Sequence, residues 1–190
     1  RSSIIIKTLN NTILIDSGPD FRQQMLRENI EDIDAIIYTH SHKDHISGLD
    51  DVRAFNFKWK KDMQLYCTKE VEDALKREYH YIFRENKYPG VPNVNVNLIK
   101  NEKFSIGKDL ILPIEGLHYK MPVFGYRVKN FAYLTDISYI SKMELNKLKN
   151  LQVLVLDCLR KEPHLSHLNL EQAIGLVNQT KPKKSYFIHI

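Results

Sequence analysis

The pattern of apolar and polar positions along the chain predicts a mixed α/β fold. Short runs rich in β-branched residues alternate with segments in which apolar residues return every three or four positions, as on one face of a helix. The strands predicted in this way are Ile4–Lys7, Thr12–Asp16, Asp34–Thr39, Leu65–Cys67, Val94–Ile99, Leu110–Glu115, Val123–Lys129, Phe131–Thr135, Gln152–Leu156 and Lys184–Ile188. These strand pairs outnumber those of a doubly wound parallel sheet, so we expect a single mixed α/β domain over residues 1–190.

Helices are predicted between the strands from capping residues and apolar spacing. In the first, Phe21, Met25 and Leu26 share one face. Glu144 and Gln172 each stand three residues after a capping residue, which is the spacing of a capping box. The predicted helices run from Pro19 to near Asn29, over Thr68–Phe83, from Ser141 to near Asn150, and onward from Asn169.

Composition and charge narrow the class of protein only slightly. The chain has 190 residues, of which 43% are hydrophobic and 27% charged, and these are ordinary values for a globular protein. Two cysteines do not make a disulfide framework, and no apolar run is long enough to span a membrane. We therefore expect a soluble, cytoplasmic protein. The net charge of +5 favours anionic ligands. The basic residues are not gathered in one segment, so the charge alone does not indicate binding of nucleic acid.

The segment from Thr39 to His45 carries the strongest chemical signal. It reads Thr-His-Ser-His-Lys-Asp-His directly after a predicted buried strand. Imidazole and carboxylate ligands suit a divalent ion such as zinc, with manganese or iron as alternatives. In an extended loop His40 and His42 point the same way, and both can reach one metal ion. Asp44 and His45 follow a bend, from which they can reach a second ion.

At these residues the sequence resembles the metallo-β-lactamase superfamily, whose hallmark H-x-H-x-D-H follows a strand. The resemblance covers essentially the whole chain. It implies an α/β fold of the αββα four-layer sandwich type, with a dinuclear metal site at one edge. Asp16, in Leu14-Ile15-Asp16, matches the aspartate that ends an early strand in this family and supports the site.

The resemblance also implies the remaining site residues. His118, Asp136 and His189 each follow a predicted strand and match the family's later metal ligands. His167, just before a helix, resembles a histidine that approaches the substrate and can act as a general acid. The implied ligands are His40, His42, His118 and Asp136 for one ion, and Asp44, His45, Asp136 and His189 for the other. Asp44, Asp136 and His167 form the implied catalytic set.

Three shorter segments resemble one branch of the superfamily. Phe124-Gly125-Tyr126, Leu134-Thr135-Asp136 and Leu156-Asp157-Cys158 are similar to the phosphoribosyl cyclic phosphodiesterase group, to which the transfer-RNA 3′-processing nucleases are related. Asp157 and Cys158 are left open as residues near the metals, but for both the simpler expectation is a buried strand end. The early Thr-Gly-Thr-Gly-like turn and the clustered cysteines of that group are absent, and the chain stops one residue after His189. We therefore expect a chain that lacks the family's N-terminal strand and C-terminal segment.

The function expected from this resemblance is hydrolysis of a small, anionic, cyclic phosphodiester by a hydroxide held between two divalent ions. One alternative is an RNA 3′-processing endonuclease, because Phe55–Lys61 mixes aromatic and basic residues as single-strand binders do. Hydrolysis of a lactone or thioester would use the same ligands. A non-catalytic binding relative is disfavoured, because all seven candidate ligands are present. A homodimer is left open, and no membrane partner is expected.

Overall fold

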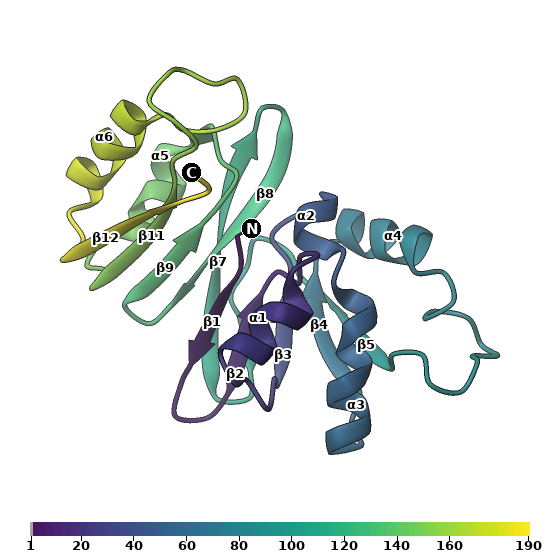
Figure 1. The fold of residues 1–190 in the computed structure, drawn as a ribbon. Helices are drawn as coiled ribbons and strands as arrows, with labels where there is room; N and C mark the ends of the chain where they lie inside the picture. The colour runs from purple at the N-terminus through teal and green to yellow at the C-terminus, as the bar shows by residue number, and fades with distance from the viewer. Residues whose placement is uncertain (1) are drawn as a thin grey trace. The chain divides into compact units, whose positions relative to one another are not determined.

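The strands form two sheets, one in each half of the chain (Figure 1). The structure is a computed structural model that describes residues 2–190. It divides into two compact units, the first ending at Lys100 and the second running from Asn101 to Ile190. Each unit carries its own sheet, helices and apolar core, so each positions its own share of the candidate site residues.

The sheet of the first unit has five strands in sequence order. They are β1 (Ile4–Lys7), β2 (Thr12–Ile15), β3 (Ala35–Ile37), β4 (Met63–Cys67) and β5 (Val94–Leu98). β1 and β2 are antiparallel, whereas β2, β3, β4 and β5 are mutually parallel. The carboxyl ends of parallel strands meet at one edge of a sheet, and ligand sites of α/β proteins form there. Asp16 follows β2 at this edge, and Thr39 and His40 follow β3.

Helices cover one face of this sheet. They are α1 (Phe21–Arg27), α2 (Lys43–Ile46), α3 (Arg53–Trp59) and α4 (Lys69–Glu78), with a 3₁₀ turn at Leu49–Val52. Phe21 of α1 and Leu75 of α4 belong to the same apolar cluster as Leu14, Ile36 and Leu65 of the strands. This packing fixes the strand ends that carry the site residues, because the buried side chains on both elements have a single well-packed arrangement.

The sheet of the second unit is mixed. Its strands are β6 (Phe104–Ile106), β7 (Asp109–His118), β8 (Met121–Val128), β9 (Phe131–Leu134), β10 (Tyr139–Ile140), β11 (Val153–Asp157) and β12 (Lys184–Ile188). The order is β10-β7-β8-β9-β11-β12, with β6 paired to β7. β9, β11 and β12 are parallel, and β7 runs in the same direction because two antiparallel pairings separate it from β9. The carboxyl ends of these four strands therefore lie at one edge.

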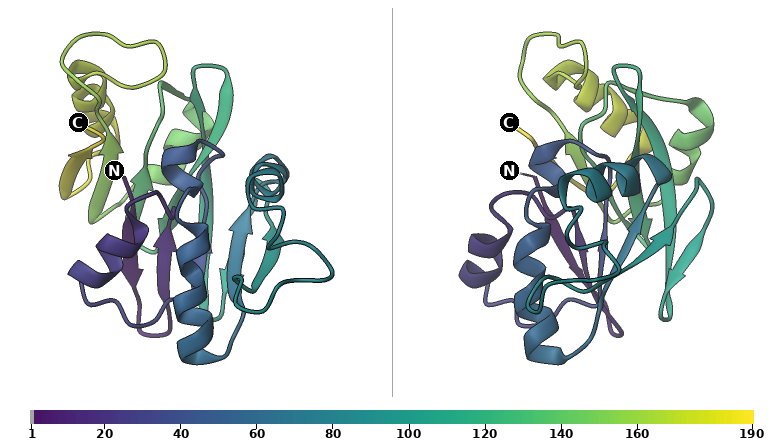
Figure 2. Two further views of the ribbon diagram at one scale, coloured as in Figure 1. Left: turned by 45° about the vertical axis from the view of Figure 1, so that its right-hand side comes forward. Right: turned by 90° about the vertical axis from the view of Figure 1, so that its right-hand side faces the viewer.

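Two short helical segments and one longer helix complete the second unit. These are α5 (Lys142–Leu145), a 3₁₀ turn at Asn146–Leu148, and α6 (Leu170–Thr180). Figure 2 shows α6 beside β11 and β12, and Ala173 and Leu176 share an apolar cluster with Leu154 and Leu156. Among residues 2–190, no helix combines the length and the apolar composition that a membrane crossing requires.

Most predicted elements of the first unit are present, and the main differences concern its helices. The predicted Thr68–Phe83 helix is too long, since α4 ends at Glu78. Leu26 was expected to share one face with Phe21 and Met25, but it is 69% exposed on α1, whereas the other two are buried. Helix α3 was not predicted, because its aromatic and polar residues do not follow a clear helical period.

The second unit differs mainly at its short elements. The Asn169 and Gln172 capping box is confirmed at the start of α6. Ser141 caps α5 as predicted, but the Glu144 carboxylate turns to a different partner, the backbone N–H of Glu115 at 2.8 Å. The helix is also shorter than expected, and a 3₁₀ turn continues it to Leu148.

Candidate metal centre

The histidine-rich segment of the first unit gathers its imidazole rings at the carboxyl edge of the sheet. His40 is 2% exposed, and its ring centroid lies 4.7 Å from that of His42 and 4.2 Å from that of His45. His42 caps the start of α2 in an extended conformation, and Asp44 and His45 lie in that helix. The sequence predicted a loop with a bend here, whereas the structure begins a short helix after His42. It brings the Asp44 Oδ2 atom to 3.6 Å from His45 Nε2.

A hydrogen-bond relay fixes which nitrogen each buried histidine of this segment presents. His45 Nδ1 lies 2.7 Å from Asp16 Oδ2, to which it donates its proton. The Thr39 hydroxyl donates to the same carboxylate at 2.8 Å and lies 2.9 Å from His40 Nδ1. Because the hydrogen of that hydroxyl points at Asp16, the Thr39 oxygen accepts a hydrogen bond from His40 Nδ1–H. Both rings therefore present Nε2 as a lone-pair donor, which is the state a metal ligand needs.

Asp16 is the centre of this relay and is completely buried. It also accepts the Thr39 backbone N–H at 2.8 Å, and its own backbone is left-handed with φ 62°. Burial raises the pKa of Asp16, while the facing His45 and the hydrogen bonds from His45 and Thr39 act to lower it. The predicted role of Asp16, support at the end of an early strand, agrees with these contacts.

Two glycines let the loops around Asp16 pack closely against α2. A Cβ at Gly18 would lie 2.3 Å from the Asp44 carbonyl oxygen. A Cβ at Gly48 would lie 2.3 Å from the Gly18 carbonyl oxygen and 2.5 Å from Cβ of Phe21. Gly48 also donates its backbone N–H to the Ser17 carbonyl at 2.7 Å. The helix that carries Asp44 and His45 is thereby held directly against the end of β2.

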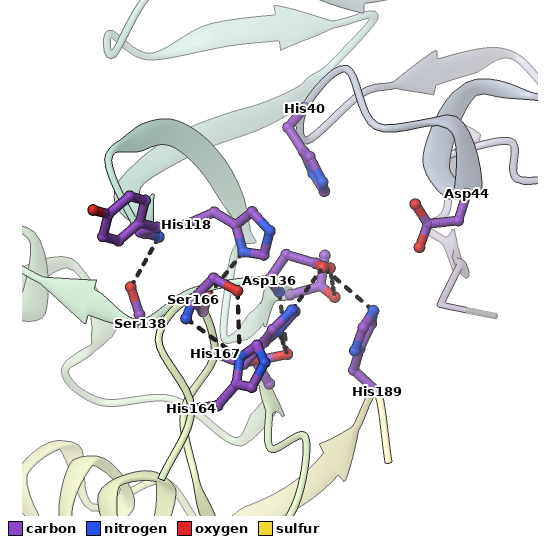
Figure 3. Close-up of polar contacts among 12 residues, drawn as sticks. His40, Asp44, His118, Asp136, Ser138, His164, Ser166, His167 and His189 are labelled. Carbon is purple, nitrogen blue, oxygen red and sulfur yellow. Dashed lines mark hydrogen bonds and ion pairs between the residues drawn. The ribbon is translucent and has the colours of Figure 1, made fainter.

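In the second unit four candidate residues meet at the carboxyl edge of the sheet (Figure 3). His118 ends β7, Asp136 follows β9, His189 follows β12, and His167 precedes α6. Ligand atoms of His118, Asp136 and His167 all lie within 4.8 Å of one another. His189 Nε2 is 3.3 Å from Asp136 Oδ1. Within this unit the structure therefore brings these four residues together.

Hydrogen bonds also orient the side chains of this second cluster. His118 Nδ1 donates to the Ser166 carbonyl at 2.8 Å, so His118 presents Nε2. The Thr135 hydroxyl donates to Asp136 Oδ2 at 2.6 Å, and Oδ1 of the same carboxylate faces His189. The His167 ring stacks on that of His189 with centroids 4.8 Å apart. Each candidate side chain is thus held in one orientation by a specific neighbour.

Asp157 lies beside the candidate ligands, a position that the sequence left open, and it makes contacts that the sequence did not reveal. It ends β11 in full burial, as expected, but its carboxylate collects three donors. These are the backbone N–H of Asp136 at 3.2 Å, the backbone N–H of Leu168 at 3.1 Å, and His167 Nδ1 at 3.3 Å. Asp157 therefore links the backbone of one candidate ligand to the ring of His167. A signal was available, because Asp157 ends a buried strand just as Asp136 and His189 do.

Of the other chemically notable residues, the two cysteines are inert, His80 lies outside the clusters, and His164 lies beside His167. Burial raises the pKa of the Cys67 thiol to about 12 and also raises that of Cys158, which fits small apolar core residues. His80 is exposed just beyond the end of α4. His164, which the sequence left unassigned, has its ring centroid 5.2 Å from that of His167.

The donor set fits divalent metal ions. Zinc, manganese and iron sites are built from neutral imidazole nitrogens and carboxylate oxygens. In such sites a hydrogen bond to the other nitrogen of each imidazole, or to the other oxygen of a carboxylate, holds the ligand in place. His40 and His45 meet this description in the first unit, and His118 and Asp136 do so in the second. The assignment of seven side chains to two ions stays a prediction.

Comparison with known proteins identifies relatives over the full length of the chain. A crystal structure described as a new diphosphatase from the PhnP family is 36% identical with a TM-score of 0.92, covering all of this chain and 73% of that one. A protein named octanoyltransferase from Porphyromonas gingivalis is 36% identical over 191 residues, and a ribonuclease Z from Nanoarchaeum equitans is 24% identical over 188 residues. The chain spans only 38% of the first of these two proteins and 54% of the second.

The family itself is established by a match over most of the chain. Residues 11–190 match the model described as beta-lactamase superfamily domain, a range that includes both clusters and Asp16. The mixed α/β character and the two sheets agree with that fold, and so does the structural match over the whole chain. The resemblance seen in the sequence is thereby confirmed, and the chain belongs to the β-lactamase superfamily.

Proposed function

We propose that this protein is a metal-dependent hydrolase that cleaves a phosphodiester bond in a small anionic substrate. The observation that carries the proposal is the fixed orientation of the buried histidines. His40, His45 and His118 each donate Nδ1–H to an oxygen and present Nε2. Histidines that bind metal ions almost always donate their second ring N–H to an oxygen, whereas surface histidines without a ligand are under no such constraint.

The proposal assigns His40, His42, His118 and Asp136 to one ion, and Asp44, His45, Asp136 and His189 to the other. Its support is that the family match includes all seven residues and that each cluster is ordered within its own unit. Zinc suits this donor set best, with manganese and iron as alternatives. Two divalent cations supply Lewis acidity, which makes water nucleophilic at neutral pH and offsets charge on phosphate oxygens.

The chain's own residues supply the proton chemistry. His167 is 7% exposed, and Asp157 holds its Nδ1, so its Nε2 is the atom available for proton transfer. That Nε2 atom lies 3.8 Å from Asp136 Oδ1, beside the candidate ligands. We assign His167 the role of general acid, which protonates the leaving oxygen as the P–O bond breaks.

The substrate class rests on charge and on one relative. A net charge of +5 favours an anionic substrate, and a cyclic phosphodiester is the class favoured by the sequence resemblance. A diphosphate linkage is a second candidate, because the 36% identical structure is described as a diphosphatase. Processing of RNA 3′ ends is a third, because one relative is named ribonuclease Z. All three reactions displace an oxygen leaving group from phosphorus.

A panel of substrates tests the proposal. Protein loaded with zinc or manganese is assayed on bis-nitrophenyl phosphate, a ribose cyclic phosphate, a nucleoside diphosphate, a precursor transfer RNA and a lactone, with metal content measured by elemental analysis. Asp136→Asn is expected to lower both metal content and turnover. Asp109→Asn changes an aspartate that is also buried but lies at the opposite end of β7 from His118, and it should retain the metal. Absence of metal and of turnover in the unmodified protein would refute the proposal.

A further inference from the structure

We propose that His164 positions the substrate by donating an N–H hydrogen bond from Nε2 to a non-bridging phosphate oxygen. The inference rests on the proposed function, since it names a contact for the same phosphate-bearing substrate. His164 belongs to the loop between β11 and α6, which also carries Ser166 and His167. It is not among the seven candidate ligands and has no part in the proton transfer assigned to His167.

The tautomer of His164 follows from its contacts with Ser166. The Ser166 backbone N–H points at His164 Nδ1 from 3.3 Å, and the Ser166 hydroxyl lies 3.3 Å from the same atom. A backbone N–H is always a donor, so Nδ1 must accept and carries no proton. The proton of the neutral ring is therefore on Nε2, and His164 presents an N–H group.

This tautomer is the opposite of the one that the hydrogen bonds assign to His40, His45 and His118. His118 gives its Nδ1 proton to the Ser166 carbonyl and so presents a lone pair at Nε2. Ser166 thus orients two histidines. Its carbonyl accepts from His118, which leaves a lone pair on His118 Nε2, and its N–H donates to His164, which places the His164 proton on Nε2. A lone pair suits a metal ion, whereas an N–H group suits an anionic oxygen.

The position of His164 matches this chemistry. Its ring centroid lies 5.2 Å from that of His167, the proposed general acid, and Figure 3 shows both rings in one cluster with Ser166. The side chain is half-buried, so it is held in place yet not enclosed by protein. A phosphate whose leaving oxygen faces His167 would have a non-bridging oxygen within reach of a neighbouring donor.

The test compares His164→Ala with His164→Gln in metal-loaded protein. The glutamine amide retains an N–H donor near the position of Nε2, so it should restore most of the lost function. We expect His164→Ala to raise KM for bis-nitrophenyl phosphate and Kd for inorganic phosphate, measured calorimetrically, by roughly tenfold each. Metal content and kcat should stay unchanged. His80→Ala, which removes an exposed histidine of the other unit, is the matched control and should alter neither constant.

Each outcome decides the inference. Unchanged KM and Kd in His164→Ala would overturn it, and so would a loss of metal content or an equal loss in His164→Gln. If the unmodified protein binds phosphate but hydrolyses none of the phosphate substrates, the proposed function fails, while the Kd series still decides the role of His164. If it neither binds phosphate nor hydrolyses these substrates, both proposals are refuted.

Discussion

Replacement of Thr39 by valine tests the hydrogen-bond relay of the first unit. Valine has nearly the shape of threonine but lacks the hydroxyl that joins His40 to Asp16. The substitution removes two buried hydrogen bonds, of 2.8 Å to Asp16 Oδ2 and 2.9 Å from His40 Nδ1. The backbone bond from Thr39 N to Asp16 is retained. The change therefore isolates the side-chain relay.

The expected loss can be worked from these contacts. Each net hydrogen bond contributes about 1 kcal/mol, and a buried polar group left without its partner costs about 1–3 kcal/mol. Asp16 still accepts from His45, so the larger cost falls on the His40 Nδ1–H group. We expect the free energy of unfolding of the metal-free protein to fall by about 2–4 kcal/mol. With His40 no longer fixed, metal affinity should fall by about 10- to 100-fold.

Two measurements and two control variants make the test specific. Urea unfolding gives the change in stability, and competition with a chromophoric chelator gives the change in zinc affinity. Thr39→Ser retains the hydroxyl and should keep most of the affinity. Thr180→Val also removes a buried threonine hydroxyl, one that donates to the Leu176 carbonyl at 2.9 Å in α6. It should cost about 1 kcal/mol of stability and leave zinc affinity unchanged.

Two results would refute the reasoning. If Thr39→Val binds zinc as tightly as the unmodified protein, the relay does not orient a metal ligand. If Thr39→Ser loses as much affinity as Thr39→Val, the hydroxyl is not the group responsible.

Further predictions concern catalysis, packing and pH. His167→Ala should lower turnover by about 10²- to 10⁴-fold on substrates with poor leaving groups but far less on nitrophenyl esters; equal losses in steady-state kinetics would argue against a general acid. Gly48→Ala should lower the free energy of unfolding by about 1–3 kcal/mol, because the added Cβ meets the Gly18 carbonyl. Gly175 lies in α6 with open space around it, so Gly175→Ala should raise the free energy of unfolding by about 0.5–1 kcal/mol. Denaturant titrations that reverse this order would contradict the packing argument. Burial raises the pKa of Glu144, but its hydrogen bonds outweigh burial and hold that pKa below the ordinary 4.5. Its contribution to stability is therefore complete above pH 4.5 and lost as the pH falls through the folded-state pKa, so Glu144→Gln should flatten the acid limb of the stability curve.

The parts of the fold that could be predicted are those encoded by neighbouring residues. The strands and the start of α6 follow from β-branched runs and from a capping box that spans three residues. The motif from His40 to His45 is equally local, since its four candidate ligands lie within six positions. The placement of Leu26 on the same face as Phe21 and Met25 was predicted wrongly, because two adjacent apolar residues of a short helix do not reveal which of them faces the sheet.

The orienting contacts of the site could not be predicted in the same way. Thr39 reaches Asp16 across 23 positions, and Asp157 reaches His167 across 10. These pairings depend on which strands become neighbours, and no local spacing encodes that. The strand order β9-β11-β12 places Asp136, Asp157 and His189 at one edge. The sequence shows that each of them ends a strand, but not that they meet.

Backbone conformation restricts how the two candidate clusters, one in each unit, can be redesigned. Asp16, Asp136 and His189 have φ values of 62°, 53° and 65°, in the left-handed region that Asn, Asp and His tolerate better than other residues with side chains. Cysteine or glutamate would alter the ligand chemistry at Asp136 and His189 and the hydrogen-bonded support at Asp16. At each of the three positions it would also add a backbone penalty. Engineering for a softer or harder metal should therefore begin at His40 and His42, whose backbones are not left-handed.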